Sequence, residues 1–264
     1  MTEEGARFDP DDEAALARFV DDLREIHADA LVAVAVTGEA ASSTYRPRRT
    51  PLQTVAVLQE VTPAKLRATR PSLRRWARRR IPTPLFLDRV YIEGALDTFP
   101  LEFLEMAEHH AVLCGDPDLF TGIRIDRAAL RLQVEEQLRG KMLHLWEAYL
   151  ECGGRRRDLK RLLQEPLPGF ELALRGLLRL REWETSGEAS GLAGARPAGV
   201  ALVDAVAAEL DLELPTFRRL ENARVEALRL DGDLDDLFEA FLIELRRIVR
   251  TIDGLPERVG PDGR

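Results

Sequence analysis

The chain has only two cysteines, Cys114 and Cys152, among its 264 residues. Two cysteines this far apart match neither the spacing of a zinc site nor a disulfide framework. We therefore expect neither of these to stabilise the fold. No run reaches the roughly 18 apolar residues that a membrane span needs. The first residues are acidic where a signal peptide is basic and then apolar. We therefore expect a cytoplasmic protein with no membrane partner.

An excess of positive charge is also missing. The chain has 46 acidic and 38 basic residues, for a formal net charge of −8. A chain with this balance does not attract nucleic acid through its overall field, so we expect no nucleic-acid partner. Any basic binding surface has to be local.

One local concentration of positive charge exists, the segment KLRATRPSLRRWARRR at residues 65–80. Helical spacing allows Leu66, Leu73 and Trp76 to form its buried stripe, which leaves the arginines in solvent. A solvated helix face is the simpler interpretation. The alternative is a surface that contacts a protein partner or another acidic group. The candidate partner-binding residues are Arg74, Arg75, Arg78 and Arg79.

The order of apolar runs predicts an α+β fold. Five short runs, several of them bounded by Gly or Pro, are typical of strands: residues 31–36, 52–58, 85–87, 101–106 and 111–114. Helical spacing is predicted at residues 11–27, 63–80 and 90–96 between them. From Asp126 the spacing is helical throughout, at residues 126–151, 156–163, 169–185, 200–210, 216–228 and 234–252. We expect a mixed β-sheet domain with flanking helices at residues 1–124, followed by an all-α helical bundle domain at residues 125–264.

The stretch VTGEAASSTYRPRRTPLQ, residues 36–53, joins the first two predicted strands. A strand, a glycine and a turn of small residues place free backbone N–H groups at one point, which favours a phosphate. Together with the order of elements around it, this stretch resembles the minimal nucleotidyltransferases of the DNA polymerase β superfamily, which include the aminoglycoside adenylyltransferases. The family signature is Gly-Ser, a loop of about ten residues, and then two acids, Asp-x-Asp or Asp-x-Glu, entering the second strand.

The resemblance assigns roles to individual positions. Gly38 matches the glycine, Glu39 replaces the serine, and Pro51 and Gln53 stand where the two carboxylates belong. Glu102 falls where a third carboxylate stands in the family and is the one candidate catalytic residue. The resemblance implies that Gly38, Glu39 and Gln53 lie together in a cleft between the sheet and the bundle.

Nucleotidyl transfer needs Mg²⁺ ions that bridge the triphosphate, and these ions prefer anionic oxygen ligands. Proline supplies no side-chain ligand and glutamine supplies a neutral one. We therefore expect no metal and no bound cofactor, and a nucleotidyltransferase-like protein that binds a nucleotide, a small polar ligand or a protein partner without catalysis. The alternative is an active transferase that uses Mg²⁺ and a nucleoside triphosphate through an atypical site.

Two further patterns have simpler interpretations. Arg139 and His144 match the Arg-x4-His spacing of ribonucleases of the HEPN helical class, but chance alone predicts about one such match in this chain. A ribonuclease is therefore the third hypothesis. Glu105 and His109 are four residues apart and are expected to form a surface pair rather than a metal site.

Overall fold

The structure is a computed structural model that describes residues 8–120, 122–186 and 196–254. These residues form two compact units. One spans residues 8–125 and includes Arg196, and the other spans residues 126–186 and 197–254. That these units fold independently, as domains 1–124 and 125–264, stays a prediction.

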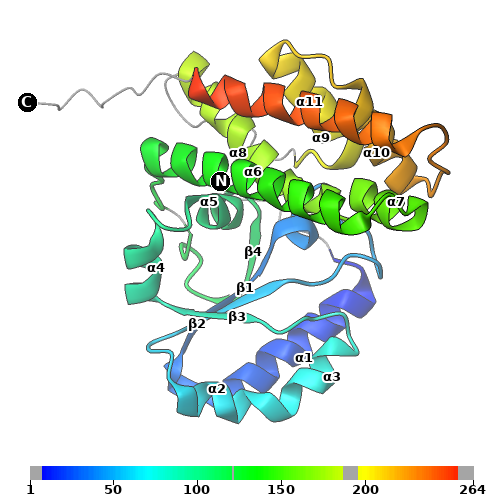
Figure 1. Ribbon diagram of the computed structural model, residues 1–264. Helices are drawn as coiled ribbons and strands as arrows, with labels where there is room; N and C mark the ends of the chain where they lie inside the picture. Colours follow the sequence, from blue (N-terminus) through cyan, green and yellow to red (C-terminus); the bar gives the residue numbers. More distant parts are fainter. Residues whose placement is uncertain (1–7, 121, 187–195, 255–264) are drawn as a thin grey trace, which may run out of the picture. The chain divides into compact units, whose positions relative to one another are not determined.

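The first unit is built on a four-stranded mixed sheet in the order β3-β2-β1-β4 (Figure 1). The strands are β1 (Leu31–Thr37), β2 (Thr54–Leu58), β3 (Leu85–Asp88) and β4 (His110–Gly115). β1 pairs antiparallel with both β2 and β4, whereas β2 and β3 run parallel. The end of β1 and the starts of the other three strands therefore lie at one edge of the sheet.

Helices cover both faces of this sheet (Figure 1). They are α1 (Pro10–His27), α2 (Pro63–Thr69), α3 (Leu73–Ala77), α4 (Arg89–Ala95) and α5 (Pro100–Glu108). On one face, Phe19 of α1 and Trp76 of α3 pack against Val34 and Val36 of β1. On the other face, a second core joins Ile92 of α4 and Phe103 and Met106 of α5 to the sheet residues Ala35, Val55 and Val57. Two faces with separate apolar cores explain why β1 and β2 are buried almost throughout.

The predicted strand at residues 101–106 is wrong, because this segment forms helix α5. Pro100 occupies the first turn of the helix, where a missing N–H costs nothing. Leu101, Phe103 and Met106 are buried. Their spacing fits a helix face as well as it fits a strand. The sheet consequently has four strands among the described residues, one fewer than expected.

The predicted helix over residues 63–80 is broken at Pro71. A short 3-10 turn, Arg70–Ser72, separates α2 from α3. Trp76 is buried at 1% exposure, as predicted, and Leu73 is half-buried. The prediction that Leu66 is buried is wrong, since its exposure is 41%. The break at Pro71 turns Leu66 away from the stripe that Leu73 and Trp76 share.

In its described part, the second unit consists of helices and no strand, as predicted. The helices are α6 (Arg127–Cys152), α7 (Arg156–Gln164), α8 (Leu167–Ser186), α9 (Gly199–Leu210), α10 (Pro215–Val225) and α11 (Leu234–Asp253). Phe170, Phe217 and Phe241 meet edge-to-face in its core. Among the described residues, no helix is long and apolar enough to cross a membrane.

His27 makes the stability of the first unit depend on pH. Its ring is 6% exposed, and Nε2 lies 3.0 Å from Thr69 Oγ1. Burial, and to a smaller extent the charge of Lys65, lower the pKa of His27 below its ordinary value of 6.5. The unfolded chain then binds a proton at a higher pH than the folded chain does. We expect the free energy of unfolding to fall as the pH drops below about 6.5, by at most about 1.4 kcal/mol per pH unit for one proton.

Thermal melting of the His27→Gln variant over this pH range checks the assignment. The melting temperature of the variant should fall less than that of the unaltered protein as the pH drops below about 6.5. The matched control is His144→Gln, because the side chain of His144 is 82% exposed, and it should keep the decrease. Equal pH profiles for the unaltered protein and the His27 variant would contradict this role.

Candidate functional site

The turn after β1 brings Gly38 and Gln53 into contact. Thr37 N donates to Gln53 O at 2.9 Å, and Gly38 has a φ of +66°. A Cβ atom on Gly38 would lie 3.2 Å from Gln53 Oε1, so the glycine accommodates both the backbone angle and the glutamine. Gly38 N donates to His109 O at 2.9 Å. This N–H is therefore already occupied and does not point freely at a phosphate site.

Glu39 is engaged by the loop that follows it. Its Oε1 accepts a hydrogen bond from Thr50 Oγ1 at 3.3 Å, and its backbone oxygen accepts one from Ser42 Oγ at 2.9 Å. Because Thr50 is buried at 3% exposure, the carboxylate end of Glu39 is held at the base of the loop. Glu39 thus ties the two ends of the loop to each other.

Gln53 immediately precedes β2, and strand alternation places it on the sheet face that α5 covers, whereas Gln53 N donates to Pro51 O at 3.0 Å in a tight turn before the strand. Gln53 is two residues before Val55, which belongs to the core shared with Phe103. Pro51 and Gln53 are both exposed. Glu102 lies in the first turn of α5 and is half-buried. Glu102 does not lie on a strand, as the predicted strand at residues 101–106 required, because this segment forms α5.

The described residues contain no cluster of three or more His, Cys, Asp or Glu side chains that could hold a metal ion. One buried polar atom near the turn lacks a partner in the described structure, the hydroxyl of Thr54. An unsatisfied buried hydroxyl costs about 1–3 kcal/mol, so it marks a place where a water molecule or a ligand group would be stabilising. Thr54 directly follows Gln53, so its side chain points to the opposite face of the sheet.

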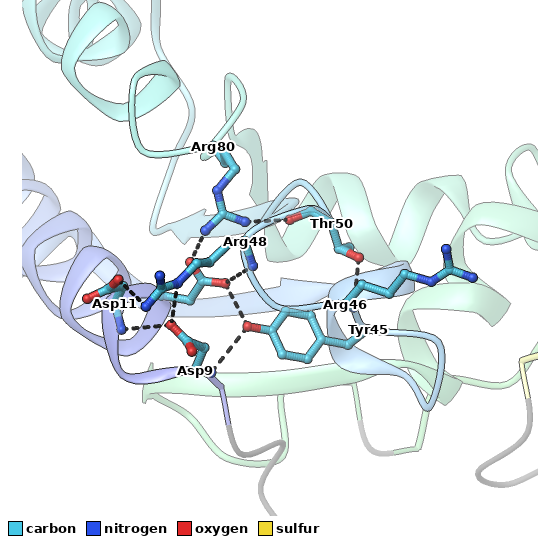
Figure 2. Close-up of polar contacts among 8 residues, drawn as sticks. Asp9, Asp11, Tyr45, Arg46, Arg48, Thr50 and Arg80 are labelled. Carbon is cyan, nitrogen blue, oxygen red and sulfur yellow. Dashed lines mark hydrogen bonds and ion pairs between the residues drawn. The ribbon is translucent and has the colours of Figure 1, made fainter.

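A polar cluster that we did not predict fixes the loop between β1 and β2 (Figure 2). Its centre is Asp12, which is buried in the first turn of α1 at 1% exposure. Arg80 forms an ion pair with one carboxylate oxygen of Asp12. The other oxygen accepts hydrogen bonds from Tyr45 Oη at 2.6 Å and from Arg48 N at 3.4 Å. We refer to Asp12, Tyr45, Arg48 and Arg80 as the loop clamp.

The loop clamp also reaches the strand that follows the loop. Arg80 donates through Nη1 to Thr50 O at 3.3 Å, and Arg80 O accepts from Leu52 N at 2.8 Å. Burial and the hydrogen bond to Asp12 raise the pKa of Tyr45 to about 12, so its phenol remains a donor at neutral pH. The residues that precede Gln53 are consequently held by α1 and by Arg80, which follows α3.

The four candidate partner-binding arginines are not equivalent. Arg74, Arg75 and Arg78 are exposed and Arg79 is half-buried. Arg75 forms an ion pair with Asp22 of α1 at 2.8 Å, and the same carboxylate accepts Trp76 Nε1 at 2.7 Å. Arg75 therefore helps to hold α3 on α1.

The other two sequence patterns do not converge on a site. Arg139 Nε pairs with Glu135 at 2.7 Å, and His144 Nδ1 lies 3.3 Å from Glu147. Each pair lies within one or two turns of α6, as on an ordinary helix surface. The expectation that Glu105 and His109 lie at the surface is wrong for His109, which is buried at 3% exposure.

The fold of this chain is that of a nucleotidyltransferase. A spectinomycin adenyltransferase from Enterococcus faecialis, solved with ATP and spectinomycin, matches with a TM-score of 0.50. The match covers 89% of this chain and 98% of that one, at 9% sequence identity. At this identity the match establishes a distant nucleotidyltransferase-like fold and no activity. No protein-family model matches the sequence, and no curated protein does.

Proposed function

We propose that this protein is a nucleotidyltransferase-fold protein that has lost nucleotidyl transfer and acts by binding. The observation that carries the proposal is the content of the β1–β2 turn. Pro51 and Gln53 occupy the positions that the family resemblance assigns to metal-binding carboxylates, and Glu39 is hydrogen-bonded to Thr50 at 3.3 Å. Two neutral residues give Mg²⁺ no anionic oxygen at these positions.

The electrostatics of the turn support the same proposal. The carboxylate of Glu39 repels a triphosphate that no metal neutralises. Gly38 N is bonded to His109 O at 2.9 Å and is not available as a phosphate donor. The group that remains at this turn is the exposed amide of Gln53. A neutral amide suits a nucleoside or another small polar ligand better than a metal–triphosphate complex.

The double variant Pro51→Asp/Gln53→Asp tests the proposal. Both positions are exposed, so the scaffold should accept the two carboxylates. We expect millimolar ATP with Mg²⁺ to leave the melting temperature of the unaltered protein nearly unchanged. In the double variant, a restored site should stabilise the fold by about 2.7 kcal/mol at a hundredfold excess of ligand over Kd.

The matched control is Gln59→Asp/Pro63→Asp, which makes the same substitutions beyond the opposite end of β2. Both of these positions are exposed at the surface of the same unit. The change at Gln59 removes its hydrogen bond to Asp29 O, which lowers the melting temperature with and without metal alike, so the control should show no metal-dependent shift. A large metal-dependent shift in the unaltered protein would favour the alternative, an active Mg²⁺-dependent transferase in which Glu102 takes part. Equal shifts in both double variants would show that added charge alone is responsible.

The second part of the proposal concerns the arginine-rich surface of α3. Arg74, Arg78 and Arg79 are candidates for contact with an anionic partner, and Arg75 contributes mainly through Asp22. This surface can bind whether or not the β1–β2 turn holds a ligand.

A further inference from the structure

One stretch of the chain has a large excess of positive charge. Between residues 40 and 87 there are eleven basic residues and one acidic residue, Glu60, in a chain whose net charge is −8. The remainder of the chain is therefore strongly acidic. A local field of this kind can attract a polyanion even where the overall charge is negative.

Three of these arginines are used by the fold. Arg48 pairs with Asp9 and Asp11, at 3.4 and 2.7 Å, and Arg75 pairs with Asp22 at 2.8 Å. Arg80 pairs with the buried Asp12. All four carboxylates come from the start or the middle of α1, so these arginines hold the loop and α3 against that helix.

Seven other arginines have no such partner. Within the described part of the chain, their side chains make no ion pair and no hydrogen bond, and all but the half-buried Arg79 are exposed. We call them the arginine surface: Arg46, Arg49, Arg67, Arg70, Arg74, Arg78 and Arg79. Elsewhere many arginines have a carboxylate within reach, as in the pairs Arg161–Glu165 and Arg175–Glu171. Unpaired guanidinium groups in this number leave the surface strongly positive.

Backbone contacts join the two parts of the arginine surface. Arg79 and Arg78 immediately precede Arg80, whose side chain and backbone bind the loop at Thr50 and Leu52. Arg46 N in turn donates to Thr50 Oγ1 at 3.0 Å. Figure 2 shows the Arg46 side chain directed away from the loop clamp. The loop arginines and the segment 78–80 that follows α3 thus lie on adjoining parts of the first unit.

The composition of this surface indicates the class of partner. Protein interfaces depend on aromatic and apolar anchors at their centre. In the described segment 61–80, Trp76 is buried, which leaves Leu66 as the large apolar side chain that is exposed. A phosphodiester backbone needs no such anchor, because a guanidinium group binds phosphate oxygens directly.

We propose that the arginine surface binds the phosphodiester backbone of a nucleic acid without sequence preference. The inference deepens the proposed binding function by naming the partner of α3, and it is independent of the β1–β2 turn. It replaces the expectation of no nucleic-acid partner, which rested on the overall charge. The described segment 61–80 has no exposed aromatic residue on which bases could stack, so contacts of this segment are confined to the backbone.

The test measures binding of the full chain to a fluorescently labelled RNA duplex of mixed sequence, about two helical turns long. Affinity should fall steeply as salt rises from about 50 to 200 mM, and it should not change when the sequence is shuffled. The double variant Arg74→Glu/Arg78→Glu should bind at least about tenfold more weakly, and the slope of log K against log salt should drop by about two.

The control is Arg247→Glu/Arg250→Glu, which changes the net charge equally at two exposed arginines of the second unit that also lack partners among the described residues. It should retain most of the affinity. The proposal is overturned if the unaltered protein does not bind the duplex at low salt, or if both double variants lose affinity equally. Tighter binding to a poly-glutamate peptide than to the duplex would likewise overturn it in favour of an acidic protein. Thermal melting with ATP and Mg²⁺ tests the proposal for the β1–β2 turn, and duplex binding tests the proposal for the arginine surface. Either proposal can therefore fail without the other.

Discussion

Replacing Asp12 by alanine should destabilise the first unit by about 2–3 kcal/mol. Removal of one partner from a buried ion pair costs about 3–5 kcal/mol when the other charge stays buried. The cost is lower here because the side chain of Arg80 is 31% exposed and can recover some hydration. The change also removes the acceptor of Tyr45 Oη and of Arg48 N.

Urea unfolding measures this effect in the first unit if tryptophan fluorescence is restricted to Trp76. The background Trp146→Phe/Trp183→Phe achieves this, because Trp76 is the third of the three tryptophans. The control is Asp21→Ala on the same helix. Its pair with Arg24 is long, 3.8 Å, and both side chains are more than half exposed, so the loss should stay below about 1 kcal/mol. Equal losses for Asp12 and Asp21 would show that the loop clamp contributes no special stability.

Replacing Gly115 by alanine should cost the first unit about 3 kcal/mol. Gly115 ends β4, pairs with Ala33 and has a φ of +90°. A Cβ atom at this position would lie 2.1 Å from Val32 O, a contact that the backbone cannot relieve without moving the strand. Left-handed backbone costs an alanine about 1–2 kcal/mol, and overpacking adds about 1–3 kcal/mol.

The control Gly122→Ala separates these two terms. Gly122 has a φ of +82°, and a Cβ atom there meets nothing within 4 Å among the described atoms. It should lose about 1 kcal/mol through the backbone term alone. If both alanine variants unfold at the same urea concentration in the Trp76 background, close packing of β4 on β1 is not what requires Gly115.

Much of the fold could be predicted from sequence because its signals are local. The helix from Pro10 has an aspartate cap and acids in its first turn, and α6 begins at the cap Asp126. The strand predicted at Leu101–Met106 was wrong because the apolar pattern of six residues fits both the period of a strand and that of a helix. Pro100 in the first turn favours the helix that is found. The predicted burial of Leu66 was wrong because Pro71 interrupts the helix that would have aligned Leu66 with Trp76.

The site could be predicted in part, for a related reason. The spacing of the family signature brings Gly38 and Gln53 together, and their contact in the structure agrees with it. The loop clamp could not be found in the same way. Asp12 binds residues 33 and 68 positions away, and no pattern in a single sequence reveals which of many arginines will reach a buried acid. The roles of Glu39, Gln53 and Glu102 in ligand binding stay predictions.

The most direct test of the central proposal compares two dissociation constants of ATP for the unaltered protein, one with excess Mg²⁺ and one with EDTA. A nucleotidyltransferase site bridges the triphosphate through metal, so Mg²⁺ should tighten its binding by more than about tenfold. With Pro51 and Gln53 in place of carboxylates, we predict either no binding or two constants that agree within about twofold. Binding that requires Mg²⁺ would contradict the proposal and show that the turn holds a metal–triphosphate complex, as the alternative of an active transferase requires.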